Sequence, residues 1–267
     1  TPLLSILFRL ASIGLNIDIV YVVHGYRFNS QSNKAIFLFF FILENILSFK
    51  VKKYITINNY DYDITKKYFS NNLIKINGLG IDLNKFHKKS NKKLKNFSIG
   101  VLSAYRKNKG YSDLIKIALK LQKYKNIKIH CYGYDDYSKY LSQCNKLNIN
   151  NIYFNNFEKN IKSKIDEFNI LLHLSYREGL PIAPLQCLAS AIPVIGYDIR
   201  GMNDLINNNY NGYLCDFKNL ECIFLKIIKI SEDKKLYENI SNNAFKSIKS
   251  SYSSNTIAKI IYKYIHE

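Results

Sequence analysis

Glu178 stands between a predicted buried strand, residues 170–174, and a predicted apolar helix that ends before Pro193. A second apolar strand, residues 193–196, follows. This strand–turn–helix–strand order is typical of α/β proteins, which bind ligands at the carboxyl ends of their strands. The helix N-terminus offers free N–H groups to an anion, whereas a carboxylate accepts hydrogen bonds from hydroxyls. The pattern therefore favours a ligand with hydroxyls beside its phosphates, such as a nucleotide-sugar.

A second turn, between the predicted strand 97–103 and the predicted helix 111–122, carries three cations: Arg106, Lys107 and Lys109. Cations before a helix suit a diphosphate. The bidentate geometry of guanidinium favours Arg106, and the position just before Gly110 favours Lys109, so the choice stays open. The alternative is an exposed basic loop without a ligand.

The stretch that ends at Ile206, HLSYREGLPIAPLQCLASAIPVIGYDIRGMNDLI, resembles the nucleotide-sugar signature of the retaining GT-B glycosyltransferases of family GT4. That signature has two glutamates separated by seven residues. Here the first is Glu178, but the second position holds Gln186, which can hydrogen-bond a ribose without the gain from charge. The usual arginine of the family's first strand is Val101. The resemblance implies donor contacts from residues of the cationic turn and of this stretch: Arg106, Lys107, Lys109, Gly179, Leu180, Gln186 and Arg200.

His24 follows a predicted apolar strand, residues 17–23, and precedes a glycine. A single histidine in such a place is more often a structural hydrogen-bonding residue. The resemblance to GT4 implies a catalytic position near the donor sugar and the acceptor, with Glu178 orienting the sugar.

The resemblance also implies the fold class, α/β of the GT-B type, with two Rossmann-like doubly wound domains facing a cleft. Regular alternation of strands and helices after residue 97 supports a parallel sheet in the second domain. We expect residues 1–90 to be the remainder of an N-terminal acceptor-side domain, 91–250 the nucleotide-sugar domain, and 251–267 a helix that crosses back. The N-terminal domain is expected to be incomplete, because the chain opens at Thr1 in a helical pattern and lacks the family's glycine-rich acceptor loop. Residues 87–96 read as a basic linker.

The formal net charge is +19 over 267 residues, with scattered lysines. Nucleic acid, an anionic membrane and diphosphate substrates are all partners that fit such a charge. The alternative is a lysine-rich composition that has no functional meaning. No nucleic-acid motif is present. The five cysteines are odd in number and show no CxxC spacing, which indicates reduced cytosolic thiols without a disulfide or zinc site.

Residues 35–49, AIFLFFFILENILSF, are the most apolar stretch but are too short to span a membrane. They form either a core helix or an interfacial helix on an anionic membrane. In the second case, replacing the flanking lysines should sharply reduce binding to acidic vesicles; these are Lys34, Lys50, Lys52 and Lys53.

Asp61-Tyr62-Asp63 is formally a DxD metal motif, but it falls at the start of a predicted helix, where acidic residues suit the dipole. No metal or cofactor is expected. We therefore predict a cytoplasmic, metal-independent retaining glycosyltransferase that moves a sugar from a nucleotide diphosphate-sugar to a saccharide or lipid-linked acceptor, with peripheral membrane attachment as an option. The alternatives are a catalytically impaired nucleotide-binding fragment and a nucleotide-sugar epimerase of the same fold.

Overall fold

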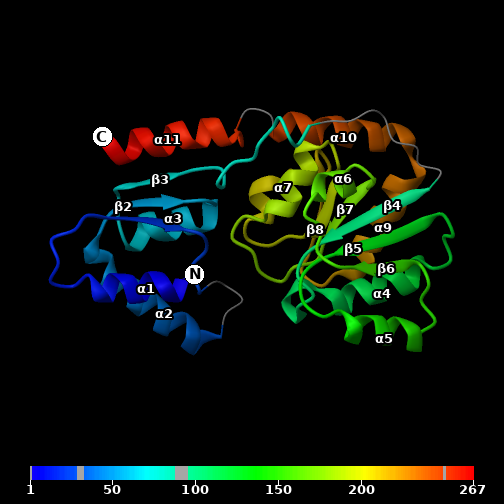
Figure 1. Cartoon of the computed structure of the whole chain (residues 1–267), viewed down its shortest axis with the longest axis horizontal. Helices are drawn as coiled ribbons and strands as arrows, with labels where there is room; N and C mark the ends of the chain where they lie inside the picture. Colours follow the sequence, from blue (N-terminus) through cyan, green and yellow to red (C-terminus); the bar gives the residue numbers. More distant parts are fainter. Residues whose placement is uncertain (1, 29–32, 88–95, 249–250) are drawn as a thin grey trace. The chain divides into compact units, whose positions relative to one another are not determined.

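The computed structural model describes residues 2–28, 33–87, 96–248 and 251–267. Two compact units make up the chain (Figure 1). One comprises the chain up to Gly80 together with Ser254–Glu267, and the other comprises Ile81–Ser253. Thr1 and most of the predicted linker, residues 88–95, lie outside the described residues.

The first unit has a sheet of three parallel strands in the order β1-β2-β3. Its strands are β1 (Ile19–Val23), β2 (Val51–Thr56) and β3 (Leu73–Lys75). Its helices are α1 (Pro2–Ala11), α2 (Lys34–Leu47), the single-turn η1 (Ser48–Lys50), α3 (Asn59–Tyr68) and α11 (Ser254–His266).

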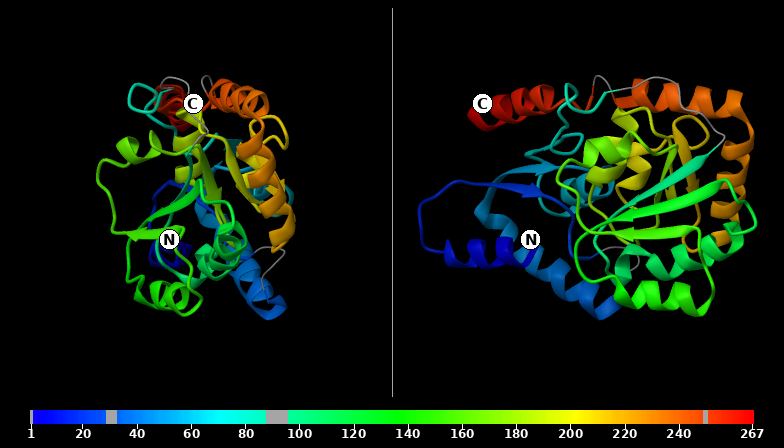
Figure 2. Two further views of the ribbon diagram at one scale, coloured as in Figure 1. Left: turned by 90° about the vertical axis from the view of Figure 1, so that its right-hand side faces the viewer. Right: turned by 45° about the vertical axis from the view of Figure 1, so that its right-hand side comes forward.

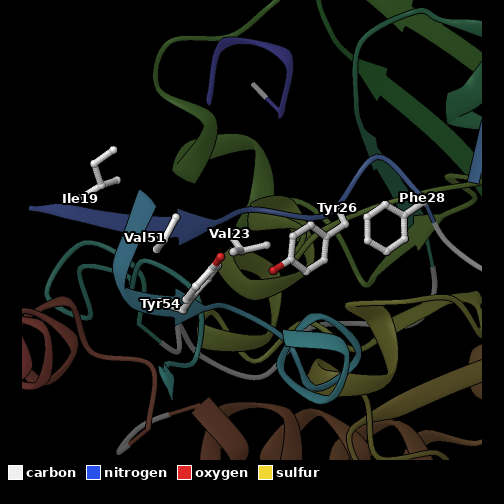
Figure 3. Packing of buried hydrophobic residues seen from close by; sticks show 6 residues of the cluster. All are labelled: Ile19, Val23, Tyr26, Phe28, Val51 and Tyr54. Carbon is white, nitrogen blue, oxygen red and sulfur yellow. The ribbon is translucent and has the colours of Figure 1, made fainter. Parts of the chain in front are cut away.

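Apolar side chains of β1, of the segment that follows it and of β2 form the core of this unit (Figure 3). Tyr26 and Phe28 stack with ring centroids 5.0 Å apart. The Tyr26 hydroxyl is bonded to Thr65 of α3 at 2.7 Å, so the core also fixes that helix. Aromatic rings, which bury large apolar areas, are prominent among the members of this core.

Helix α2 packs on the core of the unit, as the first alternative for residues 35–49 predicts, and the membrane alternative stays a prediction. One face, which includes Phe37 and Phe41, packs on the core, and Leu47 is buried. The opposite face is apolar and exposed, as is much of α1; its α2 members are Ile36, Leu38, Phe39, Ile42 and Ile46. Three of the four flanking lysines have partners within the unit: Lys50 the Leu15 carbonyl, Lys52 the Asp18 carboxylate, and Lys53 the carbonyl of Tyr264 at the end of α11.

The acidic motif at residues 61–63 begins in the first turn of α3, so it lies at the start of a helix as predicted. Asn58 caps this helix by accepting a hydrogen bond from the Asp61 amide at 2.8 Å. The buried Asp61 carboxylate accepts from the Asn58 side chain at 2.6 Å and from the Tyr26 amide at 3.3 Å. These contacts give Asp61 a structural role at the start of the helix.

The second unit has six parallel strands in the order β6-β5-β4-β7-β8-β9, with helices on both faces (Figures 1 and 2). The strands are β4 (Phe97–Leu102), β5 (Ile127–Tyr132), β6 (Ile152–Asn155), β7 (Ile170–His173), β8 (Val194–Tyr197) and β9 (Gly212–Cys215). The helices are the single-turn η2 (Lys107–Lys109), α4 (Tyr111–Leu121), α5 (Ser138–Lys146), α6 (Ile161–Ile165), α7 (Ile182–Ala189), α8 (Met202–Leu205), α9 (Leu220–Glu232) and α10 (Lys234–Ile248). Helices on both faces explain why β7 and β8 are buried along their whole length and read as continuous apolar runs.

The predicted α/β alternation is confirmed in the second unit. Strand β9 and the short helix α8 were not predicted, because four-residue elements next to turns give little periodic signal. The prediction of five free thiols is wrong for two of them. Cys215 ends β9 and Cys222 lies in the first turn of α9, and the two are joined by a disulfide. The remaining three cysteines are free and buried.

Candidate active site

Strand order places the candidate site at a reversal of the sheet. From β4 the chain builds outward to β5 and β6, then returns to the other side of β4 to form β7, β8 and β9. In such sheets, ligands bind outside the carboxyl ends of the strands at this switch point. The loop after β4 carries Lys109 and the loop after β7 carries Glu178, so the reversal brings the two predicted donor-binding turns together.

The Glu178 side chain, only 14% exposed, meets two nitrogens at a single oxygen. Lys109 Nζ donates to Oε1 at 2.7 Å, and His173 Nε2 lies 3.2 Å from the same atom. Burial alone would raise the pKa of Glu178, but the hydrogen bond and charge of His173, together with the Lys109 ammonium, lower that pKa to about 2. The carboxylate is therefore ionised at neutral pH and acts only as an acceptor.

Backbone contacts fix the turn that carries Glu178. Arg200, from the loop after β8, donates its Nε–H to the Glu178 carbonyl at 2.9 Å. Gly201 packs so closely on this turn that a Cβ there would lie 2.0 Å from the Gly179 oxygen. On the other side, the Tyr176 amide donates to the Asn108 carbonyl at 2.9 Å, which ties the turn to the cationic loop.

Gly110 lets the cationic loop approach β7. Its φ of +78° lies in the left-handed region, and a Cβ there would lie 2.1 Å from the Leu174 carbonyl oxygen. A side chain at this position would push the loop, and with it Lys109, away from Glu178.

A buried carboxylate, that of Asp113, also connects these loops through hydrogen bonds. Asp113, in the first turn of α4, accepts hydrogen bonds at Oδ2 from the hydroxyls of Tyr176 and Tyr197, both at 2.9 Å. Phe217, from the loop after β9, packs edge-on against both tyrosine rings. This cluster links the carboxyl ends of four strands and supports the turn that holds Glu178.

A pocket of about 460 Å³ opens beside these loops, at the ends of β4 and β5 and the start of α7. Tyr134 and Phe157 stack in its wall with ring centroids 4.0 Å apart, and Gln186 of α7 also lines it. Exposed aromatic faces are surfaces on which a nucleobase can stack, and an amide can bond a ribose diol.

The chain resembles known glycosyltransferases in sequence and in fold. Residues 82–247, more than half of the chain, match the family described as glycosyl transferases group 1. The chain belongs to this family. Among curated relatives, the capsular polysaccharide biosynthesis glycosyltransferase CapM of Staphylococcus aureus is 25% identical over 89% of this chain and 67% of its own length. The poly(ribitol-phosphate) alpha-N-acetylglucosaminyltransferase of S. aureus strain COL is 26% identical over 60% of this chain, which covers 33% of that protein.

Solved structures show the same fold. S. aureus TarM, in a complex with UDP, has a TM-score of 0.81 at 20% identity, over 95% of this chain and 52% of TarM. Anabaena HepE, in complex with UDP and glucose, has a TM-score of 0.84 at 17% identity, over 100% of this chain and 76% of HepE. The predicted GT-B fold is thus confirmed, and the chain spans only part of the length of these glycosyltransferase relatives.

The structure separates the three cations predicted for the donor. Lys109 is bonded to Glu178, whereas Arg106 is an exposed residue whose Nε pairs with the Asp135 carboxylate at 2.7 Å. Lys107 is exposed. Of the three, Lys109 is the cation that the fold brings to Glu178, and its contact with a diphosphate stays a prediction. Among the other predicted donor-site residues, Leu180 is buried in the turn, Gln186 lines the pocket, and Gly179 and Arg200 fix the backbone of the turn.

His24 follows β1 in the first unit and is exposed. It lines a pocket of about 380 Å³ between α1 and β1, together with the half-buried Gly25 and apolar residues of both elements. Partial withdrawal from solvent lowers the pKa of His24, so its ring is neutral at neutral pH. Its role beside the donor sugar stays a prediction.

Sequence reasoning missed His173, the Asp113 cluster and the Tyr134–Phe157 stack. His173 had one usable signal, since it is a polar residue in an otherwise apolar buried strand. The other residues lie 20 to 84 positions from their partners, so no local pattern joins them.

Among the described residues, no three His, Cys, Asp or Glu side chains are grouped as a metal site would require. No helix in the described ranges has the length and apolar character needed to cross a bilayer.

Proposed function

We propose that the chain transfers a sugar from a nucleoside diphosphate-sugar to a saccharide acceptor, without a metal and with retention at the anomeric carbon. The observation that carries this proposal is the ionised Glu178 carboxylate beside Lys109 at the switch point of the sheet. A carboxylate accepts hydrogen bonds from sugar hydroxyls, and the neighbouring ammonium attracts a diphosphate. UDP is the proposed nucleotide, because TarM and HepE have been crystallised with it.

In the proposed reaction, the bond between the anomeric carbon and the diphosphate breaks, and the nucleoside diphosphate leaves as an anion. The oxygen of the acceptor hydroxyl forms the new bond to the same face of the anomeric carbon, and the hydroxyl proton passes to the departing diphosphate. Lys109 and the free N–H groups at the start of α7 stabilise the charge that develops on the leaving oxygens. Glu178 orients the sugar through its hydroxyls, and His24 serves the reacting face. The nucleobase stacks in the pocket of Tyr134 and Phe157, with Gln186 near the ribose.

The proposed acceptor is a lipid-linked saccharide of a cell-surface polysaccharide. Support comes from relatives such as CapM and the Escherichia coli UDP-Gal:alpha-D-GlcNAc-diphosphoundecaprenol alpha-1,3-galactosyltransferase, which is 24% identical over 82% of this chain and 61% of its own length. The exposed apolar face of α2 would lie on the inner, anionic face of the cytoplasmic membrane, where such an acceptor is held.

Binding of nucleotide-sugars to the full chain tests the function. We expect UDP-glucose, UDP-galactose or UDP-GlcNAc to raise the melting temperature, and Glu178→Gln to remove most of the added stabilisation given by the sugar. Product analysis then separates transfer from epimerisation. Binding without turnover would favour the nucleotide-binding fragment, and failure of all UDP compounds to bind would refute the proposal.

Sedimentation with vesicles that contain anionic phosphatidylglycerol tests the membrane. Because three of the flanking lysines have partners inside the unit, apolar residues give the cleaner perturbation. Changing the exposed Phe39 and Ile42 to serine should release the chain from vesicles, and the same change at exposed Tyr153 of β6 is the control. Equal binding of both variants would exclude α2 as the contact.

A further inference from the structure

His173 holds Glu178 from the sheet itself. It is the last residue of β7 and only 5% exposed, and its Nε2 lies 3.2 Å from Glu178 Oε1. Because the Glu178 carboxylate only accepts hydrogen bonds, Nε2 must carry the proton and donate it. The backbone of His173 is fixed in turn, since it pairs with Gly196 of β8, where a Cβ would lie 2.5 Å from the His173 oxygen.

Lys109 bonds the same Glu178 oxygen through a flexible side chain rather than from a strand of the sheet. Its ammonium stands at the end of a flexible four-carbon stem, on the single-turn helix η2, and its side chain is 22% exposed. A lysine ammonium has three donors and can turn toward a second anion. When a diphosphate enters the site, its oxygens compete with Glu178 for this cation.

Neither Lys109 nor His173 bonds the second oxygen of Glu178. Among the residues that the structure describes, both side-chain partners of Glu178 bond Oε1, and none bonds Oε2. A carboxylate held by one oxygen presents the other to a hydroxyl in a fixed direction. This arrangement persists on donor binding only if a partner other than Lys109 remains.

We propose that His173 is the positioning residue that keeps Glu178 aligned with the donor sugar while Lys109 turns to the diphosphate. The inference rests on the proposed function and assigns the two partners of Glu178 to different parts of the donor. His173 serves recognition of the sugar and Lys109 serves recognition of the diphosphate. A purely structural histidine would instead support the fold without any preference for one part of the ligand.

The test measures binding affinities by calorimetric titration of the full chain. It compares UDP with one UDP-sugar, namely whichever of UDP-glucose, UDP-galactose and UDP-GlcNAc binds the wild-type chain most tightly. His173→Leu removes the donor, and we expect it to weaken the UDP-sugar about tenfold while leaving the affinity for UDP within about twofold. His173→Gln places an amide donor near the position of Nε2 and should restore most of the lost affinity. Lys109→Met is the complementary variant and should weaken the binding of both UDP and the UDP-sugar.

His173→Asn covers the case in which the leucine variant does not fold. Its amide is polar but too short to reach Oε1, so it should lose affinity for the UDP-sugar, and the comparison of Gln with Asn then decides. Equal loss for UDP and UDP-sugar in the His173 variants, no loss for either, or no advantage of Gln over Asn would overturn the inference. A wild-type chain that binds neither ligand would overturn the proposed function instead.

Discussion

The Asp113 cluster allows a quantitative test of how the site is held. Tyr197 is fully buried and donates its hydroxyl to Asp113, so Tyr197→Phe removes a hydrogen bond to a carboxylate from which water is excluded. Hydrogen bonds to charged groups contribute about 1.5–3 kcal/mol, and we expect the free energy of unfolding of the second unit to fall by about 2 kcal/mol. Tyr176 donates to the same oxygen but is half-buried, so Tyr176→Phe should cost only about 1 kcal/mol.

Removing the acceptor is expected to cost more than removing either donor. Asp113→Ala leaves two phenol hydroxyls without their partner, one of them buried, and we expect a loss of about 4 kcal/mol. The double variant with Tyr197→Phe should be about 2 kcal/mol less destabilised than the sum of the singles, because the second change removes a group already left unpaired.

Urea unfolding followed by circular dichroism measures these values, with one transition fitted for each unit. Circular dichroism is the suitable probe because the chain has no tryptophan. Tyr213→Phe is the matched control, since Tyr213 is buried on the neighbouring strand β9 and makes no hydrogen bond to Asp113. A Tyr197→Phe variant within about 0.5 kcal/mol of the wild type, or additive changes in the cycle, would refute the cluster as a support of the site.

Three further predictions concern other charges and the disulfide. Arg9 and Glu44 form a buried pair at 2.7 Å in the first unit, so Arg9→Met should lower the free energy of unfolding by about 4 kcal/mol, and adding Glu44→Met should recover much of it in urea unfolding. Cys222→Ser opens a loop closed over a sequence separation of 7 residues and should cost about 2 kcal/mol, with the thiol count by mass spectrometry showing one additional free thiol. The pKa of Glu178 is lowered to about 2, so its contribution of about 3 kcal/mol is fully present above about pH 4.5 and is lost as the pH falls through 2. The stability difference between wild type and Glu178→Gln should therefore stay constant from pH 8 to 5 and shrink below pH 4; a difference already shrinking at pH 6 would contradict the role of Lys109.

The sequence was sufficient to predict the order of the elements other than β9 and α8, and the place of Glu178. Both follow from local signals, namely apolar runs of strand length, a glycine turn and an apolar helix that ends before Pro193. The choice between Arg106 and Lys109 was not decidable, because it depends on how the loop bends. That bend is set by the left-handed Gly110 and by the bond from the Tyr176 amide to Asn108, a residue 68 positions earlier in the chain.

The remaining misses have different physical causes. Tyr197 lies 84 residues from Asp113, and both are of types that occur in many unrelated places. The disulfide between Cys215 and Cys222 depends on how β9 passes into α9, which cysteine counting alone does not contain. His173 was not predicted as a site residue. A fully buried strand is apolar on both faces, so its pattern does not indicate which face meets a functional group.

The departures from the GT4 pattern make sense when their charges are considered together. Val101 stands where the family usually has an arginine, and Gln186 stands where it has a second glutamate, so one cation and one anion are absent at once. The sum of these formal charges is therefore unchanged, and the diphosphate meets neither an additional carboxylate nor its usual arginine. With the arginine absent and Arg106 paired with Asp135, the proposed function requires more of the attraction for the diphosphate to come from Lys109. A lysine that is needed by the diphosphate cannot also be the sole support of Glu178, and the histidine at the end of β7 resolves that conflict.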